Sequence, residues 1–406
     1  MTKNDFFDGF SRIQTLQLYA CGKCGECLLA CPIYEETQDR NLGPAFRLRA
    51  LKSLAKAESG LRTLFFGSRK ANPKEIQKLA TSLFNGCTVC GRCMAVCPYN
   101  FDLIEIWEKA RERVVTQGFG PAPTVMIKEA VEAERNVYKM PHDSRREWLD
   151  YEDVEAPKKE KADVLYFIGC TTSYSGILNP IAHAVTSILT AAGEDWTMLK
   201  DEWCCGSPLK FAGQTEKYKD FVTHNVEVIE STNAKRVVFN CPSCYRRFIE
   251  DYPKILGRPL GFESVHITEL VEEYVKDGRI KPTQKLETTV TYHDPCELSR
   301  LSGKYNEPRS LLDKFVTTFV EMPENKVNAR CCGAGGLFAA IDPDVSKRLA
   351  TKRVEQAEEI GATILTSACP ACKLSLDGAA ADADSDLRVL DIVEVIAQQL
   401  GLMEDY

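Results

Sequence analysis

The residues best suited to chemistry in this chain are its 18 cysteines, which fall into four tight groups with none left over. Two groups follow the spacing Cys-x-x-Cys-x-x-Cys-x-x-x-Cys-Pro: Cys21, Cys24, Cys27 and Cys31, then Cys87, Cys90, Cys93 and Cys97. The other two follow Cys…Cys-Cys-Gly…Cys-x-x-Cys: Cys170, Cys204, Cys205, Cys241 and Cys244, then Cys296, Cys331, Cys332, Cys369 and Cys372. Soft thiolate ligands select iron–sulfur clusters or zinc. The grouping therefore predicts a fold built around metal.

The two four-cysteine groups have the phasing of two-cluster ferredoxins, in which the fourth cysteine of each run binds the other cluster. This rule predicts two cubane 4Fe–4S clusters, one held by Cys21, Cys24, Cys27 and Cys97 and one by Cys87, Cys90, Cys93 and Cys31. The alternative is a pair of zinc sites, although zinc motifs usually present their cysteines in twos.

The chain between these two groups has a helical pattern. One helix is expected from about residue 42 to 51, with Pro44 in its first turn, and another from Ile76 to Leu83. Residues 1–118 resemble the all-α ferredoxin domain of succinate dehydrogenase iron–sulfur subunits and of the C subunit of heterodisulfide reductase. We expect residues 119–161 to be a linker, because residues 144–162 are dense in charge. A solvated connector is the simpler interpretation, and a docking surface for a partner protein of the same complex is the alternative.

The two five-cysteine groups are copies of one pattern, repeated at an offset of 126 to 128 residues. In each copy a strand runs into the first cysteine, starting at Val164 and at Val290. A helix, a second strand and a closing helix follow: 218–231, 236–240 and 267–274 in the first copy, and 345–360, 362–366 and 390–400 in the second. This alternation predicts an α/β fold with parallel strands, in two lobes (162–281 and 282–406) related by a pseudo-twofold axis. Cys170, Cys241, Cys296 and Cys369 would lie at the carboxyl ends of strands, where sites form in such sheets.

The copies resemble the cysteine-rich domains of the B subunit of heterodisulfide reductase, called CCG domains after the signature seen here at Cys204-Cys205-Gly206 and Cys331-Cys332-Gly333. The resemblance implies a noncubane 4Fe–4S cluster on each five-cysteine set, with all ten cysteines taking part in catalysis through the clusters. A ferredoxin-type domain ahead of two such lobes looks like the D subunit of heterodisulfide reductase. Two alternatives stay open: a vicinal disulfide between Cys204 and Cys205, and a zinc or simpler cluster in one copy.

Charged and titratable residues lie close to the later cysteines. His293, three positions before Cys296, is a candidate proton donor to a departing thiolate, or else a packed and hydrogen-bonded neighbour of the site. Six cations near the five-cysteine sets could clamp an anionic substrate or balance the charge of the clusters. These are Lys210, Arg246, Arg247, Arg300, Lys304 and Lys373.

Composition and missing motifs exclude several classes. The net charge of −7 gives no basic footprint for nucleic acid. The sequence has neither a signal-like apolar start nor an apolar run long enough to span a bilayer, so we expect a cytoplasmic protein, peripheral to the membrane only through a partner subunit. No dinucleotide fingerprint follows a strand and no P-loop is present, so no flavin or NAD is expected in this chain.

Two functions fit these features. In the first, the chain is a subunit of a redox complex in which electrons pass through the two cubanes to the noncubane clusters, which reduce a small or protein-bound disulfide. In the second, it is an electron relay to a quinone, a flavoprotein or a hydroxyacid dehydrogenase. The resemblance implies partners such as a flavoprotein, a protein of hydrogenase or formate dehydrogenase type, or a membrane protein of cytochrome b type. A zinc-stabilised scaffold is a third, weaker hypothesis.

Overall fold

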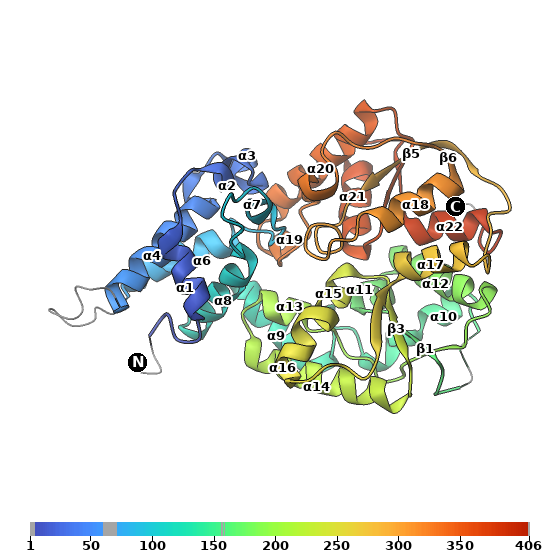
Figure 1. Cartoon of the computed structure of the whole chain (residues 1–406), viewed down its shortest axis with the longest axis horizontal. Helices are drawn as coiled ribbons and strands as arrows, with labels where there is room; N and C mark the ends of the chain where they lie inside the picture. Colours follow the sequence, from blue (N-terminus) through green and yellow to red (C-terminus); the bar gives the residue numbers. More distant parts are fainter. Residues whose placement is uncertain (1–4, 60–70, 156, 158, 405–406) are drawn as a thin grey trace. The chain divides into compact units, whose positions relative to one another are not determined.

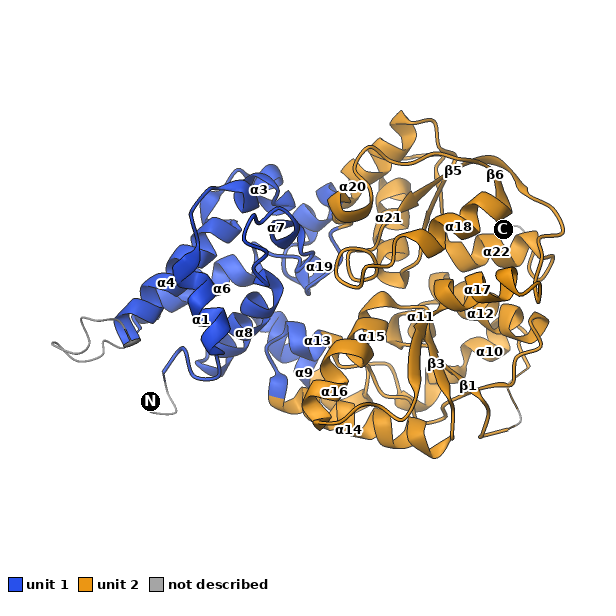
Figure 2. Cartoon of the chain, in the orientation of Figure 1, with its two compact units in different colours: residues 1–128, 208–215, 333–349 blue, residues 129–207, 216–332, 350–406 orange. Residues whose placement is uncertain are grey.

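The computed structural model describes the 406-residue chain except for residues 1–4, 60–70, 156, 158 and 405–406. The chain divides into two compact units (Figure 2). The first contains residues 1–128, 208–215 and 333–349, and the second contains residues 129–207, 216–332 and 350–406. No helix of the described part of the chain is both long and apolar enough to cross a membrane.

The N-terminal part of the first unit is helical (Figure 1). Its elements are α1 (Arg12–Ala20), α2 (Glu26–Leu29), α3 (Pro32–Thr37), the 3-10 helix η1 (Arg40–Leu42), α4 (Pro44–Ser59), α6 (Pro73–Phe84), α7 (Arg92–Ala95) and α8 (Leu103–Thr116). The predicted helices at 42–51 and 76–83 are confirmed as α4 and α6, and α4 begins at Pro44 as expected. Helix α8 buries most of its residues, including Trp107, because its apolar side chains recur at helical spacing.

The first lobe of the second unit is built on a parallel sheet with the strand order β2-β1-β3-β4. Its strands are β1 (Val164–Phe167), β2 (Trp196–Met198), β3 (Arg236–Phe239) and β4 (Glu263–His266). The helices of the lobe are α11 (Cys170–Tyr174), η3 (Gly176–Leu178), α12 (Asn179–Ala191), α14 (Thr215–Ser231), α15 (Pro242–Arg246), the π-helix η4 (Arg247–Asp251), α16 (Tyr252–Leu256) and α17 (Ile267–Lys276). Between α12 and α14 the chain forms α13 (Ser207–Phe211), which belongs to the first unit from Pro208 on. All four residues of β1 are buried, as is usual for a strand covered on both faces.

The second lobe repeats this order as β6-β5-β7-β8, again with parallel pairing. Its strands are β5 (Leu286–His293), β6 (Val316–Phe319), β7 (Ile364–Ser367) and β8 (Arg388–Asp391). Its helices are α18 (Asn306–Phe315), η5 (Lys326–Asn328), α20 (Pro343–Glu359), α21 (Pro370–Asp382) and α22 (Ile392–Gln399). The helix α19 (Phe338–Ile341) and the start of α20, up to Leu349, belong to the first unit. The prediction of two α/β lobes with parallel sheets is therefore confirmed. Within the second unit the lobes pack through α12 against α22 and α17 against α18.

The segment between the N-terminal helices and the first lobe contains α9 (Ala122–Glu134), the 3-10 helix η2 (His142–Arg146) and α10 (Trp148–Tyr151). The expectation that residues 144–162 are a solvated connector is wrong at Arg145 and Trp148, each 1% exposed. Arg145 is buried because its guanidinium finds a carboxylate partner, Glu202, in the first lobe.

Candidate metal centres

The first four-cysteine set lines one cavity of about 190 Å³, to which Cys21, Cys24, Cys27 and Cys97 all contribute. Gly25, with a φ of 93°, precedes α2 and lets the chain turn between the second and third cysteines. Burial, followed by the charges of Cys21, Cys24 and Cys97, raises the pKa of the Cys27 thiol to about 11. The structure therefore brings together the four sulfurs that the ferredoxin phasing assigns to one site. Cys24 is exposed to solvent.

The second predicted ligand set, in which Cys31 joins three cysteines of the later run, is more deeply buried than the first. Cys31, Cys87, Cys90 and Cys93 line a second pocket, and each of the four is buried. Burial raises the pKa of Cys93, and the charge of Cys87 raises it further. The backbone N–H of Val89 donates to Cys87 Sγ over 3.4 Å. The crossed grouping expected from the sequence, with Cys31 joining the later run, is thus the grouping that the fold produces.

Two buried arginines next to these sets were not singled out by sequence reasoning. Arg47 donates to the carbonyls of Ser82 and Gly86 and lies over the Trp107 ring. Arg111, on α8, donates to four carbonyls, those of Leu83, Cys87, Phe211 and Gly336. Phe211 and Gly336 follow the two Cys-Cys-Gly signatures in the sequence. Arg111 thereby joins three separate segments within the first unit.

The first five-cysteine set forms a continuous chain of sulfur contacts. Cys170 follows β1 and contacts Cys204. Cys204 contacts Cys205, Cys205 contacts Cys244, and Cys244 contacts Cys241 after β3. Hydrogen bonding with Cys204, together with burial, raises the pKa of the Cys170 thiol. Hydrogen bonds from Cys204 and Cys244 lower the pKa of Cys205 to about 6. The fold brings all five predicted residues into one group.

Nitrogen atoms donate hydrogen bonds to two sulfurs of this first five-cysteine set, those of Cys170 and Cys204. Arg145 Nη2 donates to Cys170 Sγ over 3.7 Å, and its Nη1 donates to Glu202 Oε1 over 2.9 Å. Glu202 also accepts from the backbone N–H groups of Ile168 and Gly169, which holds the loop that leads to Cys170. The backbone N–H of Gly206 donates to Cys204 Sγ. These contacts place positive charge and N–H dipoles on ligand sulfurs, which stabilises thiolate.

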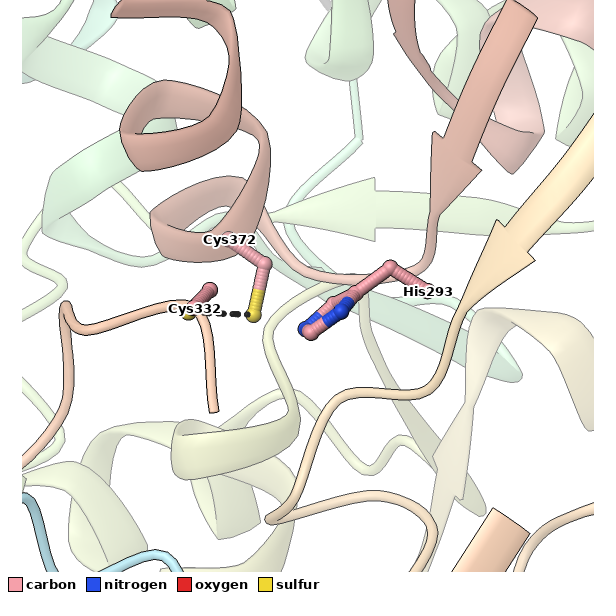
Figure 3. Close-up of side chains that lie close together, drawn as sticks. All are labelled: His293, Cys332 and Cys372. Atoms are coloured by element: carbon pink, nitrogen blue, oxygen red, sulfur yellow. Dashed lines mark hydrogen bonds between the residues drawn. The ribbon is translucent and has the colours of Figure 1, made fainter. Parts of the chain in front are cut away.

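Three cysteines of the second five-cysteine set, Cys332, Cys369 and Cys372, contact one another through Cys372. The sulfurs of Cys332 and Cys372 lie 3.3 Å apart and face each other (Figure 3). Cys369 also contacts Cys372. Cys331 is buried next to Cys332 in the sequence, and Cys296 follows β5 and is partly exposed. The first cysteine of each lobe and the Cys-Pro-x-Cys pair follow central strands, as the strand-end prediction requires.

His293 is the last residue of β5 and is 1% exposed. A ring nitrogen of His293 and the sulfurs of Cys332 and Cys372 all lie within 4.8 Å of one another, and the imidazole points toward these sulfurs (Figure 3). Arg353 Nε donates to His293 Nδ1 over 3.1 Å. Burial, and then the charge of Arg353, lowers the pKa of His293 to about 3. The packed, hydrogen-bonded arrangement is the one seen, and the proton-donor role stays a prediction.

The six cations near the five-cysteine sets all have acceptors within the protein. Lys210, Lys304 and Lys373 pair with Glu108, Glu269 and Glu394, respectively. Arg300 donates to the carbonyls of Val327 and Ala329. Arg246 and Arg247 both contact Glu297, while Arg247 also pairs with Asp251. These partners favour a role in balancing charge within the protein over a clamp for an anionic substrate.

The ligand chemistry of the four sets fits iron–sulfur clusters. Their donor atoms are all sulfur, and clustered thiolates are the ligands that such clusters use. The structure describes all 18 cysteines and joins none of them in a disulfide, so the vicinal bridge between Cys204 and Cys205 is not formed. Buried thiolates this close together repel one another, and a bound cation relieves that repulsion.

These features define an iron–sulfur protein, and comparison with known families agrees. The model of the 4Fe–4S dicluster domain matches residues 17–101. The model of the cysteine-rich domain matches twice, at residues 164–248 and 290–377. The chain is 36% identical over 397 residues to the D subunit of the dihydromethanophenazine:CoB--CoM heterodisulfide reductase of Methanosarcina barkeri, with 96% of each chain covered. The chain belongs to the family of heterodisulfide reductase D subunits and is an iron–sulfur oxidoreductase.

More distant relatives match most of this chain under different names. The chain is 28% identical to "EtfAB:quinone oxidoreductase" of Syntrophomonas wolfei, covering 94% of this chain and 58% of that protein. It is 26% identical to the B subunit of the fumarate reductase (CoM/CoB) of Methanothermobacter marburgensis, covering 94% of this chain and 72% of that protein. A crystal structure of a hypothetical protein from Helicobacter pylori matches with a TM-score of 0.60 at 12% identity, covering 98% of this chain and 75% of that one. That last likeness concerns the fold alone.

Proposed function

We propose that this chain is the subunit of a redox complex that carries electrons through two cubane clusters to two noncubane clusters, where a disulfide is reduced. The family membership supports the class of reaction. The observation that carries the proposal is that both five-cysteine sets are complete and are linked within the second unit. Arg246 and Arg247, just after Cys244, contact Glu297, which directly follows Cys296.

The ligand assignment is part of this proposal. The cubanes are held by Cys21, Cys24, Cys27 with Cys97, and by Cys87, Cys90, Cys93 with Cys31. The noncubane clusters are held by Cys170, Cys204, Cys205, Cys241 and Cys244, and by Cys296, Cys331, Cys332, Cys369 and Cys372. Two further points are proposals: the division of the chain into domains after residues 118, 161 and 281, and the pseudo-twofold relation of the lobes. The repeated strand order, with a central pair flanked by short outer strands in each lobe, supports the latter.

Electrons enter at the Cys21 set, because its ligand Cys24 is exposed whereas all four sulfurs of the Cys31 set are buried. A partner redox protein of flavoprotein, hydrogenase, formate dehydrogenase or cytochrome b type would dock there. In this proposal the chain is cytoplasmic and reaches a membrane only through such a partner.

Reduction of a disulfide consumes two electrons and two protons, breaks one S–S bond and yields two thiols. The iron–sulfur clusters supply these electrons one at a time. The contacts of Arg246 and Arg247 with Glu297 hold the two sites together, so that a disulfide bound between them would receive one electron on each sulfur. The chain's own role is to hold the two sets close together. Attack by a free cysteine is not part of the scheme, because every cysteine belongs to a ligand set.

The competing function is a relay without substrate chemistry. It is favoured by the relative named as a quinone oxidoreductase, a longer protein that matches 94% of this chain. Under this alternative the five-cysteine sets pass electrons onward to a quinone or a flavoprotein.

The test uses the intact complex, purified anaerobically, with a small or protein-bound disulfide as sole electron acceptor. We expect about 16 iron atoms per chain, about eight in the cubanes and about eight in the other two clusters. Cys205→Ala and Cys332→Ala should each abolish disulfide reduction while an artificial donor still reduces the cubanes. Turnover with a quinone or flavoprotein, but with no disulfide, would establish the relay instead. An iron content of half the expected value, together with bound zinc, would contradict the presence of noncubane clusters at the two five-cysteine sets.

A further inference from the structure

One difference between the two five-cysteine sites is the residue that ends the strand before the first cysteine. Strands β1 and β5 lead into the first cysteine of each set, and they end at Phe167 and His293, respectively. The alignment is fixed by the shared Val-x-Tyr pattern of both strands, Val164 to Tyr166 and Val290 to Tyr292. Phe167 packs against the rings of Phe239 and Phe248. Its counterpart His293 instead lies beside two ligand sulfurs.

The contact with Arg353 fixes which nitrogen of His293 carries the proton. A guanidinium only donates hydrogen bonds, so Nδ1, which receives the Arg353 Nε–H, must be an unprotonated acceptor. The proton of the neutral ring is then on Nε2. Arg353 is itself held in place, because its Nη1 donates to Gln356 Oε1 over 2.8 Å. Arg353 is therefore a positioning residue for His293.

The same contact argues against His293 as a metal ligand. A neutral histidine that binds metal through Nε2 carries its proton on Nδ1 and donates it to a neighbouring acceptor. Here the neighbour of Nδ1 is a donor, so metal binding through Nε2 would leave a ring with no proton at all. Donation of Nε2–H to a neighbouring sulfur would satisfy both ring nitrogens.

We propose that His293 donates an Nε2–H hydrogen bond to the ligand sulfurs of Cys332 and Cys372 and thereby raises the reduction potential of the second CCG cluster. The inference rests on the proposed function in one respect, the presence of an iron–sulfur cluster at this site. Hydrogen bonds to ligand sulfurs stabilise the added negative charge of the reduced state. Phe167 offers no such bond in the first lobe, where Arg145 donates to Cys170 instead. The two clusters are thus tuned by different side chains.

The test measures the reduction potential of each CCG cluster in the holoprotein by titration followed with electron paramagnetic resonance. His293→Phe, which copies the first lobe, should lower the potential of the second cluster only. His293→Gln places an amide N–H near the position of Nε2 and should restore most of the difference. An exchangeable proton coupled to the second cluster should be present in the wild type and the Gln variant and lost in the Phe variant.

A second pair of variants covers the case in which His293→Phe does not fold. Arg353→Met frees Nδ1 and should weaken the proton coupling, whereas Arg353→Lys keeps a donor there and should preserve it. His266→Phe, a change at a buried histidine of the first lobe, is the matched control and should leave the second cluster unaltered.

Two results would overturn the inference while the proposed function stands: an unshifted potential in His293→Phe with iron at full content, or nitrogen hyperfine coupling of the size given by direct ligation. Absence of iron from the second five-cysteine site would instead contradict the proposed function.

Discussion

At the scale of single residues, Arg145 shows how a side chain from outside the lobes supports a metal site. It is buried with Glu202, and together they hold Cys170 and the loop before it. Arg145→Met should destabilise the protein by about 3–5 kcal/mol, because it leaves the Glu202 carboxylate buried without its countercharge. Denaturant unfolding of the holoprotein measures this loss. The neighbouring Arg146→Met, at a less buried position, should cost less than about 0.5 kcal/mol.

A double variant distinguishes the loss of the Arg145–Glu202 ion pair from the general effect of substituting Arg145. Adding Glu202→Gln to Arg145→Met should recover part of the stability, since an amide is less costly to bury than an unpaired carboxylate. Equal stability of the single and double variants would show that the ion pair is not the cause.

The cysteines that the fold groups together could be singled out from the sequence, because their element and spacing carry the chemistry directly. The structural roles of the buried arginines could not be predicted in this way; these residues are Arg145, Arg47 and Arg111. An arginine in a charged run looks solvated until its partner is known, and the partner of Arg145 lies 57 residues away in the chain. The partners of Arg111 are backbone carbonyls of distant segments, which leave no mark on composition.

At the scale of elements, the glycines after the second Cys-Cys signature serve packing. A Cβ on Gly335 would lie 2.7 Å from the carbonyl oxygen of Thr88, the residue after Cys87. Gly335→Ala should therefore cost about 1–3 kcal/mol, through a forced shift of backbone against backbone. Gly335→Ala should also change the spectrum of the cubane that we propose Cys87 holds. Thermal unfolding and the cluster spectrum are the measurements.

The control for this prediction is Gly378→Ala in α21, where an added Cβ meets nothing within 4 Å. Alanine is the better helix former there, and a gain of about 0.5–1 kcal/mol is expected. A Gly335→Ala protein as stable as the wild type would show that the Thr88 segment yields without strain.

The central strands β1, β3, β5 and β7 could be predicted, because each leads into a cysteine of the repeated pattern. The sequence analysis did not predict the outer strands β2, β4, β6 and β8. They are three or four residues long and include exposed or half-buried positions, so they lack the apolar run that marks a buried strand. Their place in the sheet depends on pairing with β1, β3, β5 and β7 rather than on local pattern.

At the scale of the whole molecule, the first compact unit is discontinuous in sequence. Phe338, Val345 and Leu349 from the second repeat share a core with Cys31 and Ile33 of the N-terminal helices. Arg111 adds hydrogen bonds to segments from both repeats. Periodicity describes elements one at a time and cannot reveal which distant segments share a core. The set of distant segments that share the core of the first unit was therefore the part of the fold least accessible from sequence.

The two units should respond differently to removal of iron. The cysteines that we propose as ligands of the cubanes flank α2 and α7, which have only four residues each. Helices shorter than about 12 residues are unstable alone, so this region depends on its clusters for structure. The lobes instead have four-stranded sheets with buried central strands. Anaerobic chelation should therefore release amide protection first at residues 21–43 and 86–100, while β1, β3, β5 and β7 stay protected. Hydrogen–deuterium exchange with and without chelator measures both regions in one sample. Equal loss of protection in the central strands would show that the lobes, too, need metal in order to fold.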